Sequence, residues 1–173
     1  MGKDERIRIG VVLGSASDVG KVKDLFKVLD DFEVKYELAI ISAHRTHALL
    51  EEYARSAVSR GIEVIIAAAG LSAALPGVLA SLVDIPVIGI PVSAGTLGGM
   101  DALLSIAQMP PGVPVASVGI DASRNAGLLV LRILALNDSV LAGKLCEYKK
   151  DMADEVLQKS LNLKKEGYPI WEL

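Results

Sequence analysis

Short apolar runs alternate along this chain with longer segments in which apolar residues recur at helical spacing. The runs are typical of buried β-strands and the longer segments of amphipathic helices. Thr46 stands where the second helix should begin, and we expect it to cap that helix. The pattern predicts strands at 7–13, 36–41, 64–69, 86–90 and 113–118, and helices at 18–31, 46–60, 72–82, 101–108 and 123–136.

This strict alternation predicts an α/β fold with a doubly wound, five-stranded parallel sheet in a three-layer sandwich. We expect residues 1–137 to form one catalytic domain. The remainder, 138–173, is a charged tail whose apolar residues between Leu141 and Val156 recur at helical spacing. The tail adds no strand, so we expect an extra C-terminal helix that packs on the domain or on a neighbouring subunit.

Residues 64–120 contain only two charged side chains, Asp84 and Asp101. A membrane span needs about 20 predominantly apolar residues, but Pro76 and Gly77 would break a helix in the middle of the uncharged stretch 64–83. We therefore expect no membrane segment. So long an uncharged region exceeds what a small monomer easily buries, which favours an oligomer.

Composition narrows the function classes further. The formal net charge of -3 and the lack of basic runs argue against nucleic-acid binding. Cys146 is the only cysteine, so neither an intrachain disulfide nor a cysteine metal cage is expected. Charged residues between Lys3 and Arg8 do not fit a signal peptide. These features favour a cytoplasmic location.

Two polar clusters follow the first two predicted strands. Residues 14–18 read Gly-Ser-Ala-Ser-Asp, and residues 42–46 read Ser-Ala-His-Arg-Thr. Ligands of open α/β sheets bind at the carboxyl ends of the strands, so the clusters should meet in one crevice. Their groups suit a phosphorylated sugar and proton transfer. Neither cluster is a GxGxxG or Walker A motif, so no nucleotide cofactor is indicated.

Each cluster also has a purely structural interpretation. Ser and Asp are preferred helix caps, although capping uses one of the residues in 14–18 rather than three, and a helix start also suits an anion. Asp18 would repel a phosphate, so we expect it at ribose hydroxyls. Arg45 suits bidentate phosphate binding, and His44 suits general acid and base work. Too few ligands converge for a metal site.

Two further segments complete the expected crevice. Residues 69–77 follow the third strand, and their small side chains let a ligand approach the backbone; tight packing of helix on sheet explains them equally well. Residues 101–114 are expected as a loop at the mouth or at an interface.

Taken in order, these segments resemble the carboxyaminoimidazole ribonucleotide mutase family of purine biosynthesis from about Ile9 to Leu136. The resemblance implies a flavodoxin-like fold assembled as a homo-octamer. It also implies transfer of a carboxylate from the exocyclic nitrogen of an aminoimidazole ribonucleotide to a ring carbon, through carbon dioxide and without a metal or organic cofactor. The segments that carry it are 14–18, 42–46, 75–77, 86–92, 101–110 and 125–126.

The resemblance also assigns roles to individual residues. His44 would be the general acid and base, and Asp18 would hold the ribose. The phosphate would be bound by Ser17, Ser42 and Arg45. The remaining substrate-binding residues, which would face the base and the carboxylate or adjoin them, are Ser15, Ala43, Gly70, Leu71 and Leu75.

Two positions depart from the mutase pattern. Ala74 stands where that branch usually has a histidine, so residues 70–75 lean toward the sister branch, which carboxylates aminoimidazole ribonucleotide directly with carbon dioxide. That branch typically has lysine where this chain has Arg45. His47 replaces a usual proline and is expected at the surface. A carboxylase of another heterocycle and a non-enzymatic phosphate-ligand or flavin-binding module remain alternatives; Trp171 is the only tryptophan, which disfavours flavin stacking.

Overall fold

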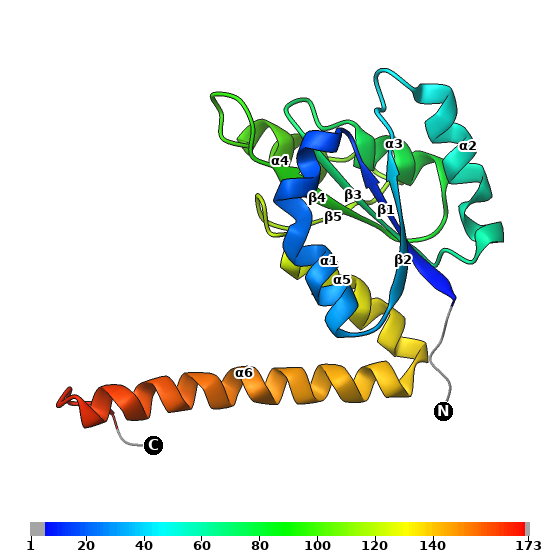
Figure 1. Ribbon diagram of the computed structural model, residues 1–173. Helices are drawn as coiled ribbons and strands as arrows, with labels where there is room; N and C mark the ends of the chain where they lie inside the picture. Colours follow the sequence, from blue (N-terminus) through cyan, green and yellow to red (C-terminus); the bar gives the residue numbers. More distant parts are fainter. Residues whose placement is uncertain (1–5, 172–173) are drawn as a thin grey trace. The chain divides into compact units, whose positions relative to one another are not determined.

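The computed structural model describes residues 6–171 and contains a five-stranded, all-parallel sheet (Figure 1). The strand order is β2-β1-β3-β4-β5, which is the flavodoxin-like order. The sequence prediction of a doubly wound parallel sheet is therefore confirmed. The strands are β1 (Ile7–Leu13), β2 (Lys35–Ile40), β3 (Val64–Gly70), β4 (Val87–Val92) and β5 (Ala116–Ser117).

Helices connect the strands and cover both faces of the sheet. Short 3₁₀ segments, η1 (Ala16–Val22), η2 (Val58–Arg60) and η3 (Ala135–Asn137), adjoin the α-helices. The α-helices are α1 (Lys23–Asp31), α2 (His47–Ala57), α3 (Leu75–Leu82), α4 (Met100–Ala107), α5 (Ser123–Leu134) and α6 (Ser139–Lys165).

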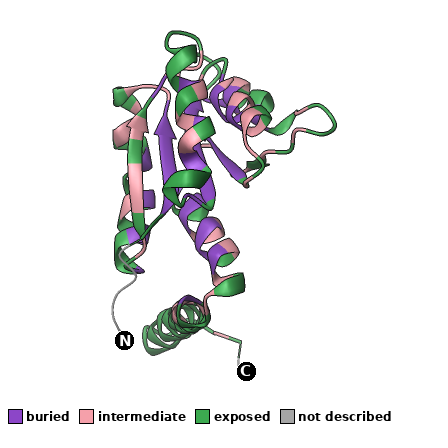
Figure 2. Ribbon diagram, turned by 90° about the vertical axis from the view of Figure 1, so that its right-hand side faces the viewer, coloured by how far each residue is buried: buried purple, intermediate pink, exposed green. Residues whose placement is uncertain are grey.

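The core lies between the sheet and the two helical layers, and the central strands are buried (Figure 2). On one face Leu50 of α2, Leu79 of α3 and Ile106 of α4 belong to a single buried cluster with the sheet. On the other face α5 approaches α1 so closely that a Cβ on Gly127 would lie 3.2 Å from Leu25. These layers bury the central strands, and the loops at the carboxyl ends extend from this packed core.

Three elements differ from the sequence prediction. The helix expected over 18–31 begins as the 3₁₀ segment η1, as helix starts often do. The helix expected from Ser72 begins at Leu75, because Pro76 fits only the first turn. β5 keeps two of the six expected residues, since it is an edge strand that pairs with β4 only through Ala116 and Ser117.

The chain divides into two compact units, one ending at Leu131 and the other beginning at Arg132. The second unit is dominated by α6, whose predicted helical character is confirmed. Asp138 caps α6 by accepting a hydrogen bond from the backbone N–H of Leu141 at 3.0 Å. Among the helices formed by residues 6–171, none is long and apolar enough to cross a membrane.

Candidate active site

A cavity of about 670 Å³ opens at the carboxyl ends of β1, β2 and β3. It lies where the strand order reverses between β1 and β3, the usual ligand site of such sheets. Four chain segments contribute to it, each following a different strand. Its lining residues are Gly14, Ser15, Ser17, Asp18, Ser42, Ala43, His44, Arg45, Ala69, Gly70, Leu71, Ser72, Ala73, Ala74, Leu75 and Ala94.

The loop after β1 supplies two hydroxyls and a carboxylate. Ser15 is the N-cap of η1, and its Oγ accepts hydrogen bonds from the backbone N–H of Ser17 at 3.3 Å and from Ser17 Oγ at 2.8 Å. The cap interpretation is thus correct for Ser15 alone. Ser17 and Asp18 line the cavity without being needed as caps, so they are available to a ligand.

Asp18 is half-buried at this edge of the cavity. Burial raises the pKa of the Asp18 carboxyl above its ordinary value, because the charged form loses water, while hydrogen bonds from Ser17 and from the backbone at Ser15 lower it in part. A carboxylate that has lost water gains more from a new hydrogen-bond donor than an exposed one does. Asp18 is therefore suited to accept from ligand hydroxyls.

The loop after β2 arranges an arginine over a serine. Ser42 Oγ accepts hydrogen bonds from the backbone N–H of Arg45 at 3.3 Å and from Arg45 Nε at 3.4 Å. Thr46 is the N-cap residue of α2, but its side chain does not cap the helix. Instead Thr46 Oγ1 accepts from the backbone N–H of Ser42 and donates to the Ser42 carbonyl, both at 3.0 Å. The expected cap at Thr46 is thus wrong, because its hydroxyl closes the loop that presents Arg45.

His44 and His47 have different surroundings. His44 lines the cavity, and none of residues 6–171 forms a hydrogen bond or ion pair with its imidazole. His47 is the first residue of α2, is 59% exposed and lies 3.3 Å from Glu51 Oε1, outside the cavity lining. The expected surface position of His47 is therefore what the structure has, and His44 alone of the two can reach a ligand here.

The segment after β3 forms a wall of small side chains. A Cβ on Gly70 would lie 3.1 Å from the Val92 carbonyl oxygen, so the tight approach of β3 to β4 favours glycine there. Leu71 has a φ of 55°, a left-handed conformation that is unusual for a leucine. Ala74 is the N-cap residue of α3 and has no side chain that could cap it. This wall leaves the backbone accessible to a ligand.

All ten residues that the sequence analysis assigned to a site line this one cavity. Sequence reasoning missed Ala94, which follows β4 and reaches the cavity beside Leu71. The signal was available, because Ala94 also stands at the carboxyl end of a strand. Among residues 6–171, no group of three His, Cys, Asp or Glu side chains could hold a metal ion.

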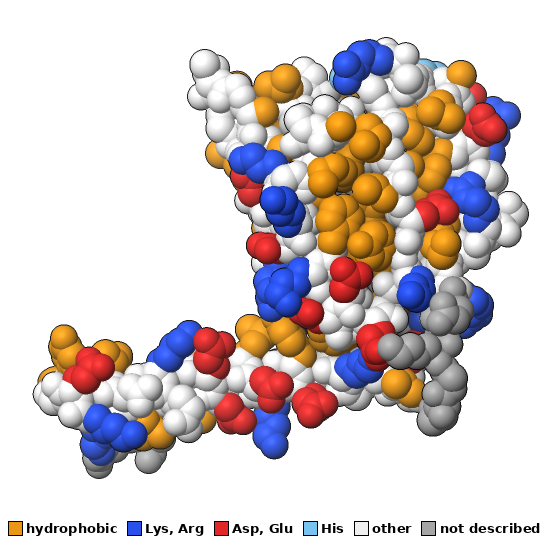
Figure 3. Space-filling model, viewed as in Figure 1, with side chains coloured by type: hydrophobic (Ala, Val, Ile, Leu, Met, Phe, Trp, Pro, Cys, Tyr) orange, Lys and Arg blue, Asp and Glu red, His pale blue; other side chains and the backbone are white. Residues whose placement is uncertain are grey.

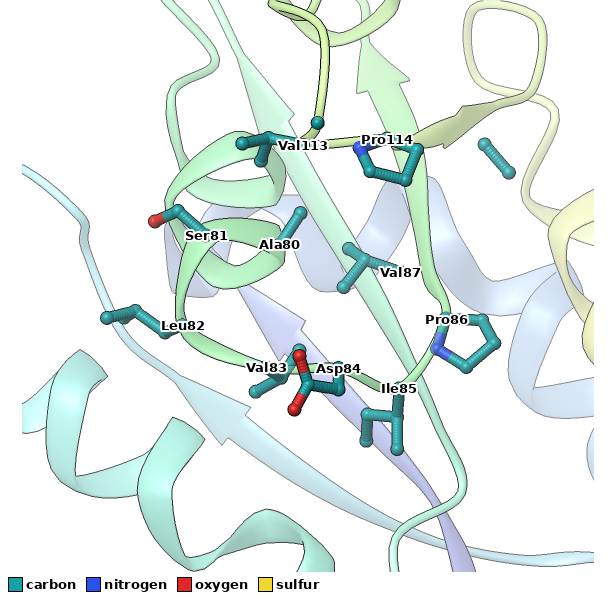
Figure 4. Close-up of a pocket in the computed structure, with 12 residues that line it drawn as sticks. Ala80, Ser81, Leu82, Val83, Asp84, Ile85, Pro86, Val87, Val113 and Pro114 are labelled. Carbon is teal, nitrogen blue, oxygen red and sulfur yellow. The ribbon is translucent and has the colours of Figure 1, made fainter.

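A second cavity, of about 580 Å³, lies near the amino ends of β4 and β5 (Figure 4). Asp84 is the one charged residue in its lining, and the labelled side chains around it are mostly aliphatic. Residues 112–114 contribute to this cavity and not to the first, so the end of the segment 101–114 does not lie at the mouth of the candidate site. Of these two cavities, only the first is lined by Asp18, His44 and Arg45 together.

Comparison with known proteins assigns this arrangement to a family. A family model described as AIR carboxylase matches residues 8–155. The chain belongs to the AIR carboxylase family. Within that family it is 57% identical over 145 residues to the N5-carboxyaminoimidazole ribonucleotide mutase of Pyrococcus abyssi, covering 84% of this chain and 83% of the relative. It is 49% identical over 161 residues to the mutase of Thermotoga maritima, covering 93% and 94%.

The chain is also similar to a fungal carboxylase and to a solved crystal structure. The phosphoribosylaminoimidazole carboxylase of Schizosaccharomyces pombe is 49% identical over 160 residues, but this chain spans only 29% of its length. The crystal structure of PurE from Treponema denticola superposes with a TM-score of 0.84 at 28% identity, covering 92% of this chain and 99% of that one. The sequence prediction of the family is thus confirmed.

Proposed function

We propose that this protein is an N5-carboxyaminoimidazole ribonucleotide mutase that acts in purine biosynthesis. The observation that carries the proposal is one cavity in which an imidazole, an arginine, a half-buried carboxylate and four serine hydroxyls meet. Relatives named as this mutase cover nearly the whole chain at 46–57% identity, which supports the same reaction here.

Substrate binding is divided between the two polar loops. Arg45, oriented by Ser42, supplies a planar guanidinium for the phosphate, and Ser17 adds a hydroxyl. Asp18 accepts hydrogen bonds from the ribose hydroxyls, and these bonds are favourable because the half-buried carboxylate has lost part of its water. These contacts are remote from the reacting atoms, so their binding energy serves to hold the imidazole in place.

His44 carries the proton in both halves of the reaction. The protonated imidazole gives its proton to the exocyclic nitrogen, the bond from that nitrogen to the carboxylate breaks, and carbon dioxide leaves. The ring carbon then attacks the carbon dioxide and forms a carbon–carbon bond. Neutral His44 removes the proton from that ring carbon, which restores aromaticity and returns His44 to its starting state. The net change is an isomerisation, and we propose that it uses no metal or organic cofactor.

Carbon dioxide must stay beside the ring carbon between these two steps. Ser15 and the wall formed by Gly70, Leu71, Ala74 and Leu75 line the cavity, and we propose that they hold the carbon dioxide there. Confinement raises the effective concentration of the trapped molecule far above that in solution.

Direct carboxylation of aminoimidazole ribonucleotide with carbon dioxide is the second candidate function. It is favoured by Ala74, which lines the cavity where a mutase usually has a histidine. The fungal carboxylases at 48–49% identity belong to the same family, although this chain spans under a third of their length. Arg45 and the mutases that match over most of their length favour the mutase.

A paired assay without ATP separates the two. One reaction receives the N-carboxylated aminoimidazole ribonucleotide, and the other receives aminoimidazole ribonucleotide with bicarbonate at a physiological level. Efficient conversion in the first reaction alone supports the mutase. Conversion in the second with none in the first overturns it in favour of the carboxylase. If neither reaction gives product, both enzymatic functions are overturned, and a non-enzymatic ligand-binding protein is left.

We further propose that the protein works as a cytoplasmic homo-octamer. Apolar side chains gather on the face that carries the edge strand β2 (Figure 3), where Leu38 and Ile40 are 45% and 49% exposed. Helix α6 adds exposed Val156 and Leu161. Light scattering should give a mass of about 146 kDa, eight times the 18.2 kDa of one chain. A monomer mass would contradict this assembly.

A further inference from the structure

Three polar side chains form a cluster beside the cavity without lining it. They are Lys21 from η1, Ser93 after β4 and Asp121 after β5. Lys21 Nζ donates hydrogen bonds to Ser93 Oγ at 2.7 Å and to Asp121 Oδ2 at 3.2 Å. Asp121 accepts from the backbone N–H of Ser93 at 2.9 Å and from the Ser93 hydroxyl. The cluster therefore ties together three strand ends that are distant in the sequence.

The backbone at Asp121 is shaped for this contact. Its φ is 54°, in the left-handed region that aspartate tolerates better than most residues. The Asp121 N–H donates to the Pro91 carbonyl at 2.9 Å, which places the turn directly beside the end of β4. Burial would raise the pKa of Asp121, but its hydrogen bonds from Ser93 and Lys21 outweigh this and lower the pKa. The carboxylate is thus charged near neutral pH.

Ser93 begins a short segment, residues 93–99, that reaches the cavity. Ala94 lines the cavity, and a Cβ on Gly95 would lie 3.1 Å from Leu71 Cδ2, so the segment rests on the leucine of the β3 wall. The segment then turns back, because a Cβ on Gly99 would lie 3.0 Å from the Cα of Ser93. Gly95, Gly98 and Gly99 all have positive φ, so the backbone here has little stiffness of its own.

We propose that Lys21 and Asp121 are positioning residues that fix Ser93, so that segment 93–99 and Leu71 keep the cavity closed around released carbon dioxide. The inference rests on the proposed mutase reaction, in which no covalent bond holds the carbon dioxide between the two steps. Its retention then depends on the walls. A loose segment 93–99 would leave the cavity open beside Leu71 and Ala94, neither of which is assigned to the phosphate or the ribose.

The expected effect is leakage rather than weak binding. When carbon dioxide escapes, the enzyme releases aminoimidazole ribonucleotide instead of the carboxylated ring product. The ratio of these two products, formed from the same N-carboxylated substrate, measures how often the intermediate is lost. A purely structural cluster would lower the amount of folded enzyme and leave this ratio unchanged.

The test uses two variants of the full-length chain. Asp121→Gly removes the carboxylate while keeping a residue that adopts positive φ readily, and Lys21→Met removes the charge. We expect each to raise the share of aminoimidazole ribonucleotide by about fivefold or more, since a charge-assisted network is lost, with KM changed by less than about threefold. The matched control is Lys27→Met, which breaks the exposed Lys27–Asp31 pair on α1 and should leave the ratio unchanged. An unchanged ratio in both cluster variants overturns the proposal.

Amide hydrogen exchange separates this inference from the proposed function. Faster exchange at residues 94–99 in Asp121→Gly, but not in Lys27→Met, supports positioning whether or not the wild type isomerises the substrate. Equal exchange in all proteins overturns it. Failure of the wild type in the paired assay instead overturns the mutase itself, so the two failures have different signatures.

Discussion

Ser42 Oγ lies within 3.4 Å of Arg45 Nε and also accepts a hydrogen bond from the Arg45 backbone N–H. One hydroxyl therefore orients both the backbone and the guanidinium of the neighbouring arginine. Arg45 is exposed, so without this contact its long side chain would sample many rotamers. The pair presents a cation that is arranged before the ligand arrives.

Ser42→Ala should raise KM for the ribonucleotide with little change in kcat. The lost hydrogen bond corresponds to about 1 kcal/mol, or roughly fivefold in KM. Arg45→Lys should raise KM by about tenfold, because lysine cannot bind a phosphate through a planar fork. Steady-state kinetics on both variants checks this. A change confined to kcat would show that the pair acts on the chemistry and not on binding.

His44→Asn should lower kcat by about 10²- to 10⁴-fold, the usual contribution of a general acid–base residue. Aminoimidazole ribonucleotide should still bind, since the phosphate and ribose contacts remain; calorimetric titration measures this. His47→Asn is the matched control, because His47 is 59% exposed and outside the cavity. Retained turnover in His44→Asn would remove His44 from the mechanism.

Substrate binding should weaken as the pH falls, and Asp18 should contribute to the loss. Burial raises the pKa of Asp18, so its charged form is lost at a higher pH than for an ordinary aspartate. KM measured from about pH 4 to pH 7 should rise toward acid in the wild type. In Asp18→Asn the value should be higher throughout and depend less on pH. Titration of the substrate phosphate affects both proteins and cancels in the comparison.

The same shift has a consequence for stability. A carboxyl with a raised pKa in the folded state binds its proton more tightly there than in the unfolded chain. Its contribution to stability therefore falls as pH rises through the window just above the ordinary aspartate pKa. Asp18→Asn should be at least as stable as the wild type at pH 7, by no more than a few tenths of a kcal/mol because the group is only half-buried and solvent screens it. Thermal unfolding at pH 7 measures it.

Gly89→Ala should destabilise the fold without touching the cavity. Gly89 is buried in β4, and an added Cβ would collide with Ile106 Cγ2 and press on Pro76 and Val115. Overpacking of this kind costs about 1–3 kcal/mol, so the melting temperature should drop by roughly 3–10 °C. Gly143→Ala is the control: it lies within α6 with nothing near its Cβ position, and it should not lower the melting temperature.

The fold and the convergence of His44 and Asp18 followed from local patterns. Both residues lie in polar clusters that follow apolar runs. Because the carboxyl ends of parallel strands meet at one edge of the sheet, this position alone predicts that the two residues lie close together. The start of α3 follows from a local signal, because Pro76 fits only the first turn of a helix. The left-handed turn at Leu71 has no such local signal, and its side chain packs against Gly95 from a distant segment.

Ser93 and Asp121 follow the fourth and fifth strands, so the same rule pointed to them. Their contact with Lys21 joins positions 72 and 100 residues apart in the sequence, which no periodicity reveals. The predicted fifth strand, 113–118, is longer than β5, because only Ala116 and Ser117 of this apolar run pair with β4. Local pattern thus fixed the elements and the strand ends, whereas side-chain pairing between them required the three-dimensional structure.

The cavity receives residues from segments that follow four different strands. A fragment that lacks any one of these four strands therefore cannot contain the whole site, because the strands must first be assembled in the order β2-β1-β3-β4. During folding, ligand binding should appear only with the last of these pairings. Substrate added to a refolding reaction would then report the completed sheet rather than any earlier collapsed state.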